Sequence, residues 1–371
     1  MKYQEFLSQF SSESITRTSS RNFSTNKIHI DQSALNIDEK VFSMFEEYAK
    51  KNNFIENFNE LMSGERLNNT ENRAVTHFNY RDAKSDIYEA SLNKMETLAS
   101  EIKSRFKKIL IFGIGGSYLG PKLMNDIFSS QDIEIDFITG SDSAEYQNYI
   151  EQDLSDCAFI ITSKSFSTIE TLTSYSAITK GKLLDQTFAV TSAVNKAEAF
   201  GIDSNNIAQI DLGTGGRFSI WSAVNLGLFI SLGRDGFENL LSGAKSIDDL
   251  SSIDVNNNSA LSLAIQDLIM NNVLEMDSTL ILNYDYKLRN FSSYAQQLEM
   301  ESLGKSIDRD TGQALSYETG SIVWGGYGPR SQHSFFQHLF QGTKEANTYF
   351  IVSKTDNLNF KQFKGQTRSL I

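Results

Sequence analysis

Residues 109–120 read Ile-Leu-Ile-Phe-Gly-Ile-Gly-Gly-Ser-Tyr-Leu-Gly. The four apolar residues are typical of a buried parallel strand. Gly113, Gly115 and Gly116 then predict a tight backbone turn, and residues 119–128 predict a helix with Pro121 in its first turn. At such a junction the free backbone N–H groups and the helix dipole favour an anion. We interpret the stretch as a phosphate site; the alternative is that its glycines only let the strand and helix pack closely.

The glycine spacing indicates which class of phosphorylated ligand this site would bind. In the dinucleotide-binding pattern the third glycine would fall on Tyr118, so the pattern is not met. A P-loop requires a lysine after its glycines, and none follows here. The stretch therefore predicts a site for a small phosphorylated ligand.

Strand and helix patterns alternate on both sides of this stretch, and the alternation predicts a doubly wound parallel sheet. The predicted strands of the first half are residues 108–112, 133–139, 158–162, 188–191 and 207–212. Ligands of such folds bind where the strands end. Ser-Lys-Ser-Phe-Ser-Thr (163–168) follows one predicted strand, before a helix starting near Glu170, and its hydroxyls and ammonium form a second phosphate-binding cluster. The alternative for this segment is an ordinary helix cap with a surface lysine.

A glycine-rich loop closes the first half of the chain. It reads Gly-Thr-Gly-Gly-Arg-Phe-Ser-Ile-Trp-Ser (213–222), where glycines permit a close approach to a ligand and Arg217 offers a planar set of donors. The alternative is a loop in which the arginine forms a structural salt bridge.

The remaining patterns predict an α/β protein with two doubly wound units, the second smaller than the first, and an N-terminal helical extension. We divide the chain into a helical region, 1–100, a first subdomain with the phosphate site, 101–240, and a second subdomain, 241–371. The helical region includes 38–51 and a helix over 70–81, with Thr70 as its N-cap and Arg73, His77 and Arg81 along one face. In the second half we predict helices at 261–273, 288–305, 334–341 and 360–370, and strands at 279–284, 322–324 and 348–352.

Composition narrows the classes of function. The 371 residues carry a net charge of −12, which argues against nucleic-acid or acidic-membrane partners. The single cysteine, Cys157, allows no disulfide within the chain. We expect a cytoplasmic protein, because no apolar run approaches membrane-spanning length and the first residues lack a signal-peptide core. Four histidines without paired spacing predict no metal site.

Six blocks in order resemble the phosphoglucose isomerase family, from about residue 64 onward. They are Asn-Asn-Thr-Glu-Asn-Arg-Ala-Val-Thr-His (68–77), Gly-Ile-Gly-Gly-Ser-Tyr-Leu-Gly-Pro (113–121), Ser-Lys-Ser-Phe-Ser-Thr-Ile-Glu-Thr (163–171), Gly-Gly-Arg-Phe-Ser-Ile-Trp-Ser (215–222), Gln-Leu-Glu-Met-Glu-Ser-Leu-Gly-Lys (297–305) and Ser-Gln-His-Ser-Phe-Phe-Gln (331–337). The resemblance implies two sugar-isomerase subdomains, a homodimer, and interconversion of glucose 6-phosphate and fructose 6-phosphate without a cofactor.

The resemblance also implies a role for particular residues. Glu301 would move the proton between C2 and C1, Arg217 would stabilise the enediolate, and His333, supplied by the neighbouring subunit, would assist ring opening. The substrate would be bound by Gly116, Ser117, Ser163, Lys164, Ser165, Thr168, Gly216 and Gln297. These roles suit the chemistry, because one carboxylate can carry the proton along a cis-enediol and a fixed cation stabilises the oxyanion.

One part of the family pattern has no counterpart in this sequence. Family members continue beyond a helix like 357–370 with an Asp-Gln-x-Gly-Val-Glu block and a substrate-contacting lysine, whereas the sequence ends at Ile371. A second hypothesis is therefore a catalytically weak sugar-phosphate-binding protein with a sensing or structural role. Additional activity on mannose 6-phosphate is a further hypothesis. The presence of Glu301, Arg217 and His333 favours the enzyme.

Overall fold

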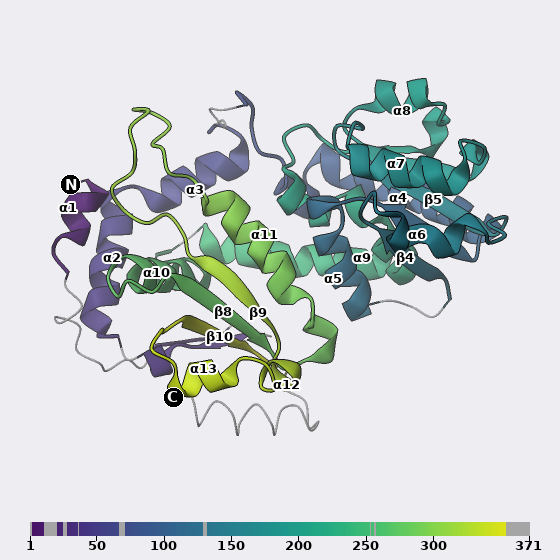
Figure 1. The fold of residues 1–371 in the computed structure, drawn as a ribbon. Helices are drawn as coiled ribbons and strands as arrows, with labels where there is room; N and C mark the ends of the chain where they lie inside the picture. The colour runs from purple at the N-terminus through teal and green to yellow at the C-terminus, as the bar shows by residue number, and fades with distance from the viewer. Residues whose placement is uncertain are drawn as a thin grey trace. The chain divides into compact units, whose positions relative to one another are not determined.

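The computed structural model describes residues 2–10, 21–24, 28–35, 37–66, 71–128, 132–252, 254–255 and 257–353 (Figure 1). By their internal contacts the residues form two compact units. Unit 1 combines residues 1–60 with 247–371, and unit 2 is the continuous segment 61–246. The predicted division at residues 100 and 240 stays a prediction. The predicted helix 360–370 lies outside the described residues.

Unit 2 is built on a five-stranded parallel sheet with the strand order β4-β3-β5-β6-β7. Its strands are β3 (Lys108–Phe112), β4 (Glu134–Ile138), β5 (Cys157–Thr162), β6 (Thr187–Thr191) and β7 (Ile207–Gln209). This confirms the parallel sheet expected from the alternating pattern, with strand ends shifted by at most three residues and none for β3. Because all strands run the same way, their carboxyl ends lie at one edge of the sheet.

Helices cover both faces of this sheet. They are α4 (Asp86–Arg105), α5 (Leu119–Phe128), α6 (Ser143–Ile150), α7 (Ile169–Thr179), α8 (Val194–Phe200) and α9 (Leu226–Ser251). Successive residues of a strand point to opposite faces. Accordingly Ile109 and Ile111 belong to a core shared with α4 and α9, whereas Leu110 and Phe112 pack in a second core with α6 and α7. Burial on both faces explains the unbroken apolar run of β3.

The helix predicted over 70–81 is wrong. Thr70 lies outside the described residues, and the rest of the segment contains only a short 3₁₀ helix at Asn79–Arg81. Thr76 shows the reason, because its N–H donates to the carbonyl of Gly213 (3.3 Å) and its hydroxyl donates to the carboxylate of Asp211 (2.8 Å). The segment thus forms hydrogen bonds with a loop distant in sequence instead of with its own preceding turn.

Unit 1 contains a three-stranded parallel sheet with the order β10-β8-β9. The strands are β8 (Ser278–Asn283), β9 (Ile322–Tyr327) and β10 (Asn347–Ile351), and the helices of this region are α10 (Ser259–Asn272), α11 (Phe291–Leu303), α12 (Gly328–Ser331) and α13 (Phe336–Gln341). Ile281 packs toward Ala295 of α11, whereas Leu280 and Leu282 pack toward Phe336 of α13. The second predicted α/β sheet is therefore confirmed.

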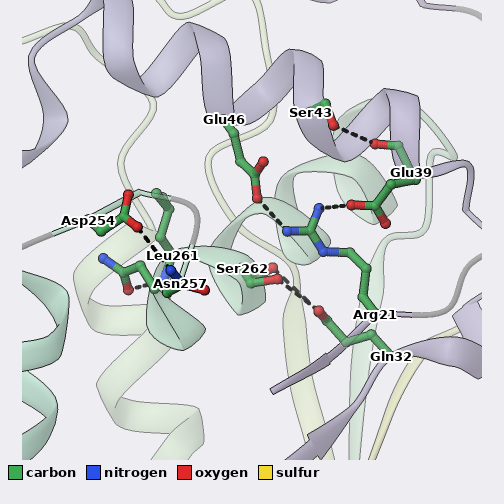
Figure 2. Close-up of polar contacts among 10 residues, drawn as sticks. Arg21, Gln32, Glu39, Ser43, Glu46, Asp254, Asn257, Leu261 and Ser262 are labelled. Carbon is green, nitrogen blue, oxygen red and sulfur yellow. Dashed lines mark hydrogen bonds and ion pairs between the residues drawn. The ribbon is translucent and has the colours of Figure 1, made fainter. Parts of the chain in front are cut away.

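The N-terminal part of unit 1 contains α1 (Tyr3–Leu7), α2 (Glu39–Lys51), α3 (Phe54–Ser63) and a hairpin of β1 (Asn22–Ser24) and β2 (His29–Asp31). The hairpin was not predicted. Figure 2 shows Arg21 directed at Glu39 (3.0 Å) and Glu46, both on α2. It also shows Ser262 of α10 donating to the side chain of Gln32 at 2.8 Å, which ties the hairpin to the second half of the chain.

A buried polar chain continues from this contact. Gln32 donates to Gln266 (2.7 Å), Gln266 donates to Asn347 (2.9 Å), and Asn347 donates to the carboxylate of Asp267 (2.7 Å). The hydroxyl of Tyr349 also donates to Asp267 at 2.7 Å. Burial raises the pKa of Asp267 to about 6, against the effect of these two donors. The chain links the N-terminal segment, α10 and β10 through satisfied hydrogen bonds.

Among the described residues, no helix combines the length and the apolar character that crossing a membrane requires.

Candidate functional site

Three loops meet at the carboxyl edge of the unit 2 sheet. They follow β3 (113–117), β5 (163–168) and β7 (210–217). A Cβ atom built on Gly116 would lie 2.3 Å from the carbonyl carbon of Gly216, so the first and third loops are in direct backbone contact. Gly113 is equally confined, with Thr162, the last residue of β5, 3.1 Å from such an atom. The close packing expected of these glycines is therefore present, and it lies at the edge where ligands of parallel sheets bind.

The loop after β5 is held rigidly by its neighbours. The carbonyl of Lys164 accepts the N–H of Ser192 (3.0 Å) and the hydroxyl of Thr191 (3.1 Å). Phe166, buried and with a φ of 46°, turns the chain back toward α7. The hydroxyls of Ser163 and Thr168 lie 2.9 Å apart. Two predicted phosphate ligands thus converge, and Thr168 does not cap the first turn of α7, whose N–H groups point to the same edge.

Lys164 provides the positive charge of this loop. Its side chain is half-buried, and burial lowers its pKa, assisted by the nearby positive charge of Arg73. The carboxylates of Glu71 and Asp211 act in the opposite direction. A partly desolvated ammonium on the loop that carries these two hydroxyls and leads into the N-terminus of α7 is well suited to a phosphate.

We predict that Lys164→Ala lowers the affinity for inorganic phosphate and for fructose 6-phosphate about ten- to a hundred-fold, because one charged hydrogen bond contributes roughly 1.5–3 kcal/mol. Isothermal titration calorimetry measures this directly. Lys94→Ala is a matched control that should keep the affinity of the unmodified protein: Lys94 also belongs to unit 2, and its ammonium donates to the backbone carbonyl of Asn205 (2.8 Å), which is not a residue of the proposed site. Unchanged affinity in Lys164→Ala would place the phosphate elsewhere.

Arg217 lies on the third loop, in a 3₁₀ helix over Gly216–Trp221. The helix is stabilised by the hydroxyl of Ser219, which donates to the carbonyl of Gly216 (2.6 Å). The guanidinium is half-buried and lies 5.0 Å from the ring centre of Phe218, which stacks on His77 at 4.8 Å. Burial lowers the pKa of His77 to about 3, so the ring packs as a neutral group. The Arg217 guanidinium therefore packs against a pair of stacked aromatic rings.

Asp211 organises the third loop and was not among the predicted site residues. Its carboxylate accepts the N–H of Gly213 (2.8 Å) and the hydroxyl of Thr76 (2.8 Å), and its own N–H donates to the hydroxyl of Tyr80 (3.0 Å). An aspartate two residues after a strand and two residues before a glycine is a typical turn signal, and this signal could have identified it. Asp211 fixes the loop that bears Gly216 and Arg217.

In unit 1, α11 carries two of the predicted residues on one face. The amide of Gln297 donates to the carboxylate of Glu301 at 3.0 Å, as positions four residues apart on a helix allow. Glu301 is exposed, in the last turn of the helix. A carboxylate that is accessible and oriented by an amide is equipped to accept a proton from a bound molecule.

His333 lies just beyond α12, on the loop that follows β9. Its Nε2 is 2.9 Å from the side-chain amide nitrogen of Gln332, and the imidazole is exposed. The helix predicted over 334–341 begins later, at Phe336, so His333 precedes it by a turn. The described residues contain no cluster of three or more His, Cys, Asp or Glu side chains that could hold a metal ion.

Two parallel sheets flanked by helices, with a cluster of glycine backbone, hydroxyls and one lysine at a carboxyl edge, define an α/β protein of the sugar-isomerase type. The sequence profile described as phosphoglucose isomerase matches residues 31–368. The chain belongs to the phosphoglucose isomerase family.

Particular relatives agree with this assignment. The chain is 33% identical to the glucose-6-phosphate isomerase of Christiangramia forsetii over 88% of its own length and 66% of that protein's. It is 34% identical to that of Legionella pneumophila strain Paris, over 90% of its own length and 72% of that protein's. The crystal structure of a glucose-6-phosphate isomerase from Chlamydia trachomatis shares the fold, with a TM-score of 0.84, 24% identity, and coverage of 99% of this chain and 80% of that one. The chain spans just under two-thirds of the length of the first of these relatives.

Proposed function

We propose that this protein interconverts glucose 6-phosphate and fructose 6-phosphate, as an aldose–ketose isomerase of glycolysis and gluconeogenesis. The observation that carries the proposal is the convergence of Gly116, Gly216 and the Ser163–Thr168 hydroxyl pair at one sheet edge beside Lys164. Such an arrangement suits a phosphate group, and the chain belongs to the phosphoglucose isomerase family. The predicted cytoplasmic location belongs to the same proposal.

The proposed roles follow the chemistry of the groups. Gly116, Ser117, Ser163, Lys164, Ser165, Thr168 and Gly216 bind the phosphate end of the substrate, and Gln297 binds the sugar. Glu301 takes the proton from C2 and returns it to C1. Arg217 stabilises the negative charge that develops on oxygen in the enediolate. His333 exchanges a proton with the ring oxygen during opening, for which an imidazole is suited near neutral pH.

The direct test is an assay in which fructose 6-phosphate is supplied and the glucose 6-phosphate formed is oxidised by a coupled dehydrogenase. The proposal expects turnover well above the rate without protein. Binding of the phosphosugar by calorimetry without turnover, and without exchange of the C2 proton with solvent, would contradict the isomerase and favour the sugar-phosphate-binding protein.

We further propose that the protein is a homodimer in which His333 acts at the partner's site. If so, mixing inactive Glu301→Gln with inactive His333→Ala should restore part of the activity, because one of the two sites in a mixed dimer carries both intact groups. The rate measured after subunit exchange has been verified by mass spectrometry tests this. No recovery in verified mixed dimers would show that both groups act from one chain.

A further inference from the structure

The segment 71–76 lies directly against the third loop of the unit 2 site. A Cβ atom built on Gly213 would lie 2.3 Å from the carbonyl oxygen of Ala74. The Thr76 hydroxyl contacts both the Asp211 carboxylate and the Thr214 hydroxyl, each at 2.8 Å. The segment therefore forms a fourth element at the sheet edge where the phosphate loops converge, and Arg73 belongs to it.

Among the described residues, Arg73 forms an ion pair with Glu71 alone. Its Nε donates to the carboxylate of Glu71 at 2.8 Å, which leaves the two terminal nitrogens of the guanidinium outside this ion pair. The side chain is 35% exposed, so a ligand can reach it. Burial lowers the pKa of Lys164, and the Arg73 guanidinium is close enough to lower it further. The hydrogen bond with Glu71 raises the pKa of Arg73, and the carboxylate of Asp211 adds to this effect.

Two cations thus lie near each other at the phosphate loops of an acidic protein. In the described part of the chain no carboxylate forms an ion pair with Lys164. The carboxylates of Glu71 and Asp211 offset part of the repulsion between these two cations. A doubly charged anion would gain from both cations. A guanidinium also presents paired donors that match two phosphate oxygens, which a lysine cannot do.

We propose that Arg73 is a further substrate-binding residue, which contacts the phosphate group of the substrate together with Lys164. Glu71 is its positioning residue, because the ion pair orients the guanidinium. This inference rests on the proposed function only in naming a sugar phosphate as the ligand; the site itself would bind any phosphate monoester dianion.

The test compares Arg73→Gln with Arg73→Lys and with the control Arg105→Gln. Arg105 lies in unit 2 and forms a similar ion pair, with Glu101 at 2.7 Å, on a helix whose side chains take no part in the site. We expect Arg73→Gln to raise the KM for fructose 6-phosphate about ten- to a hundred-fold with kcat changed less than about threefold, since a charged contact present throughout the reaction is lost. Arg73→Lys should recover part of the loss, and Arg105→Gln should behave as the unmodified protein.

Calorimetry with inorganic phosphate separates this inference from the proposed function. If the unmodified protein binds phosphate but does not isomerise, the proposed function fails, and a weaker binding of phosphate by Arg73→Gln still supports the role of Arg73. Equal phosphate affinity and equal KM in Arg73→Gln and Arg105→Gln would overturn the inference. Thermal unfolding of each variant shows whether it is folded. If Arg73→Gln is not folded, Arg73→Lys becomes the test variant. A phosphate affinity of Arg73→Lys equal to that of the unmodified protein would then count against the proposal.

Discussion

Glu301→Gln is expected to remove isomerisation while leaving phosphosugar binding intact. Glutamine keeps the size and polarity of the side chain and can still contact Gln297, but it cannot accept the C2 proton. Loss of a general base typically costs about 10²–10⁴-fold in rate, and more when no second base can take over. The measurements are kcat in the coupled assay and the affinity for fructose 6-phosphate by calorimetry.

The matched control is Glu47→Gln, which alters an exposed helical glutamate of unit 1 that pairs with Lys51 four residues later. This control should retain full turnover. If Glu301→Gln turned over as fast as the control, another group would be the base, and α11 would lose its assigned role in catalysis.

Gly116→Ala should damage the phosphate site more severely than any single ligand change. The added methyl group would lie 2.3 Å from the carbonyl carbon and oxygen of Gly216 and 2.7 Å from the N–H nitrogen of Arg217. Backbone atoms cannot rotate away as a side chain can, so the loops must separate. Overpacking typically costs about 1–3 kcal/mol of stability, and a displacement of about 1 Å can cost on the order of 10²-fold in function. Calorimetry with inorganic phosphate and thermal unfolding measure both effects.

Gly243→Ala provides the control for this substitution. Gly243 lies within α9 with no atom within 4 Å of a built Cβ, and its φ is not positive. Alanine there should leave phosphate binding unchanged and stabilise the helix by roughly 0.4–1 kcal/mol. Phosphate affinity in Gly116→Ala equal to that in Gly243→Ala would show that the contact between the two loops is not needed for the site.

The helices and strands that could be predicted are those whose sequence signals lie within the element or next to it. The helix over 119–128 was predicted with its observed bounds, because the glycine turn before it and the apolar spacing within it are both local signals. Parallel strands such as β3 were equally predictable, since burial on both faces imposes a continuous apolar run.

The segments that were not predicted correctly are determined by contacts with residues far away in sequence. Residues 71–81 have helix-like spacing, but Thr76 finds its hydrogen-bond partners in the loop after β7, and no local pattern contains that information. The same holds for the hairpin at β1 and β2, which is stabilised through Gln32 by Ser262. In the candidate site, Lys164 and Thr168 were found by their motif, whereas the place of Arg73 near Lys164 was not. The roles assigned to the site residues stay predictions.

Unit 1 is formed by two segments that lie before and after unit 2 in the sequence, and this affects the state of the chain during its synthesis. Phe42 and Phe45 of α2 belong to the same buried cluster as Leu261 and Ile265 of α10. At about 5–20 residues per second, synthesis of the more than 200 intervening residues takes on the order of 10–40 s. During that time α2 lacks the core that it covers in the finished protein, while the continuous unit 2 can already assemble. A newborn chain therefore exposes an apolar stripe near its N-terminus until α10 has been synthesised.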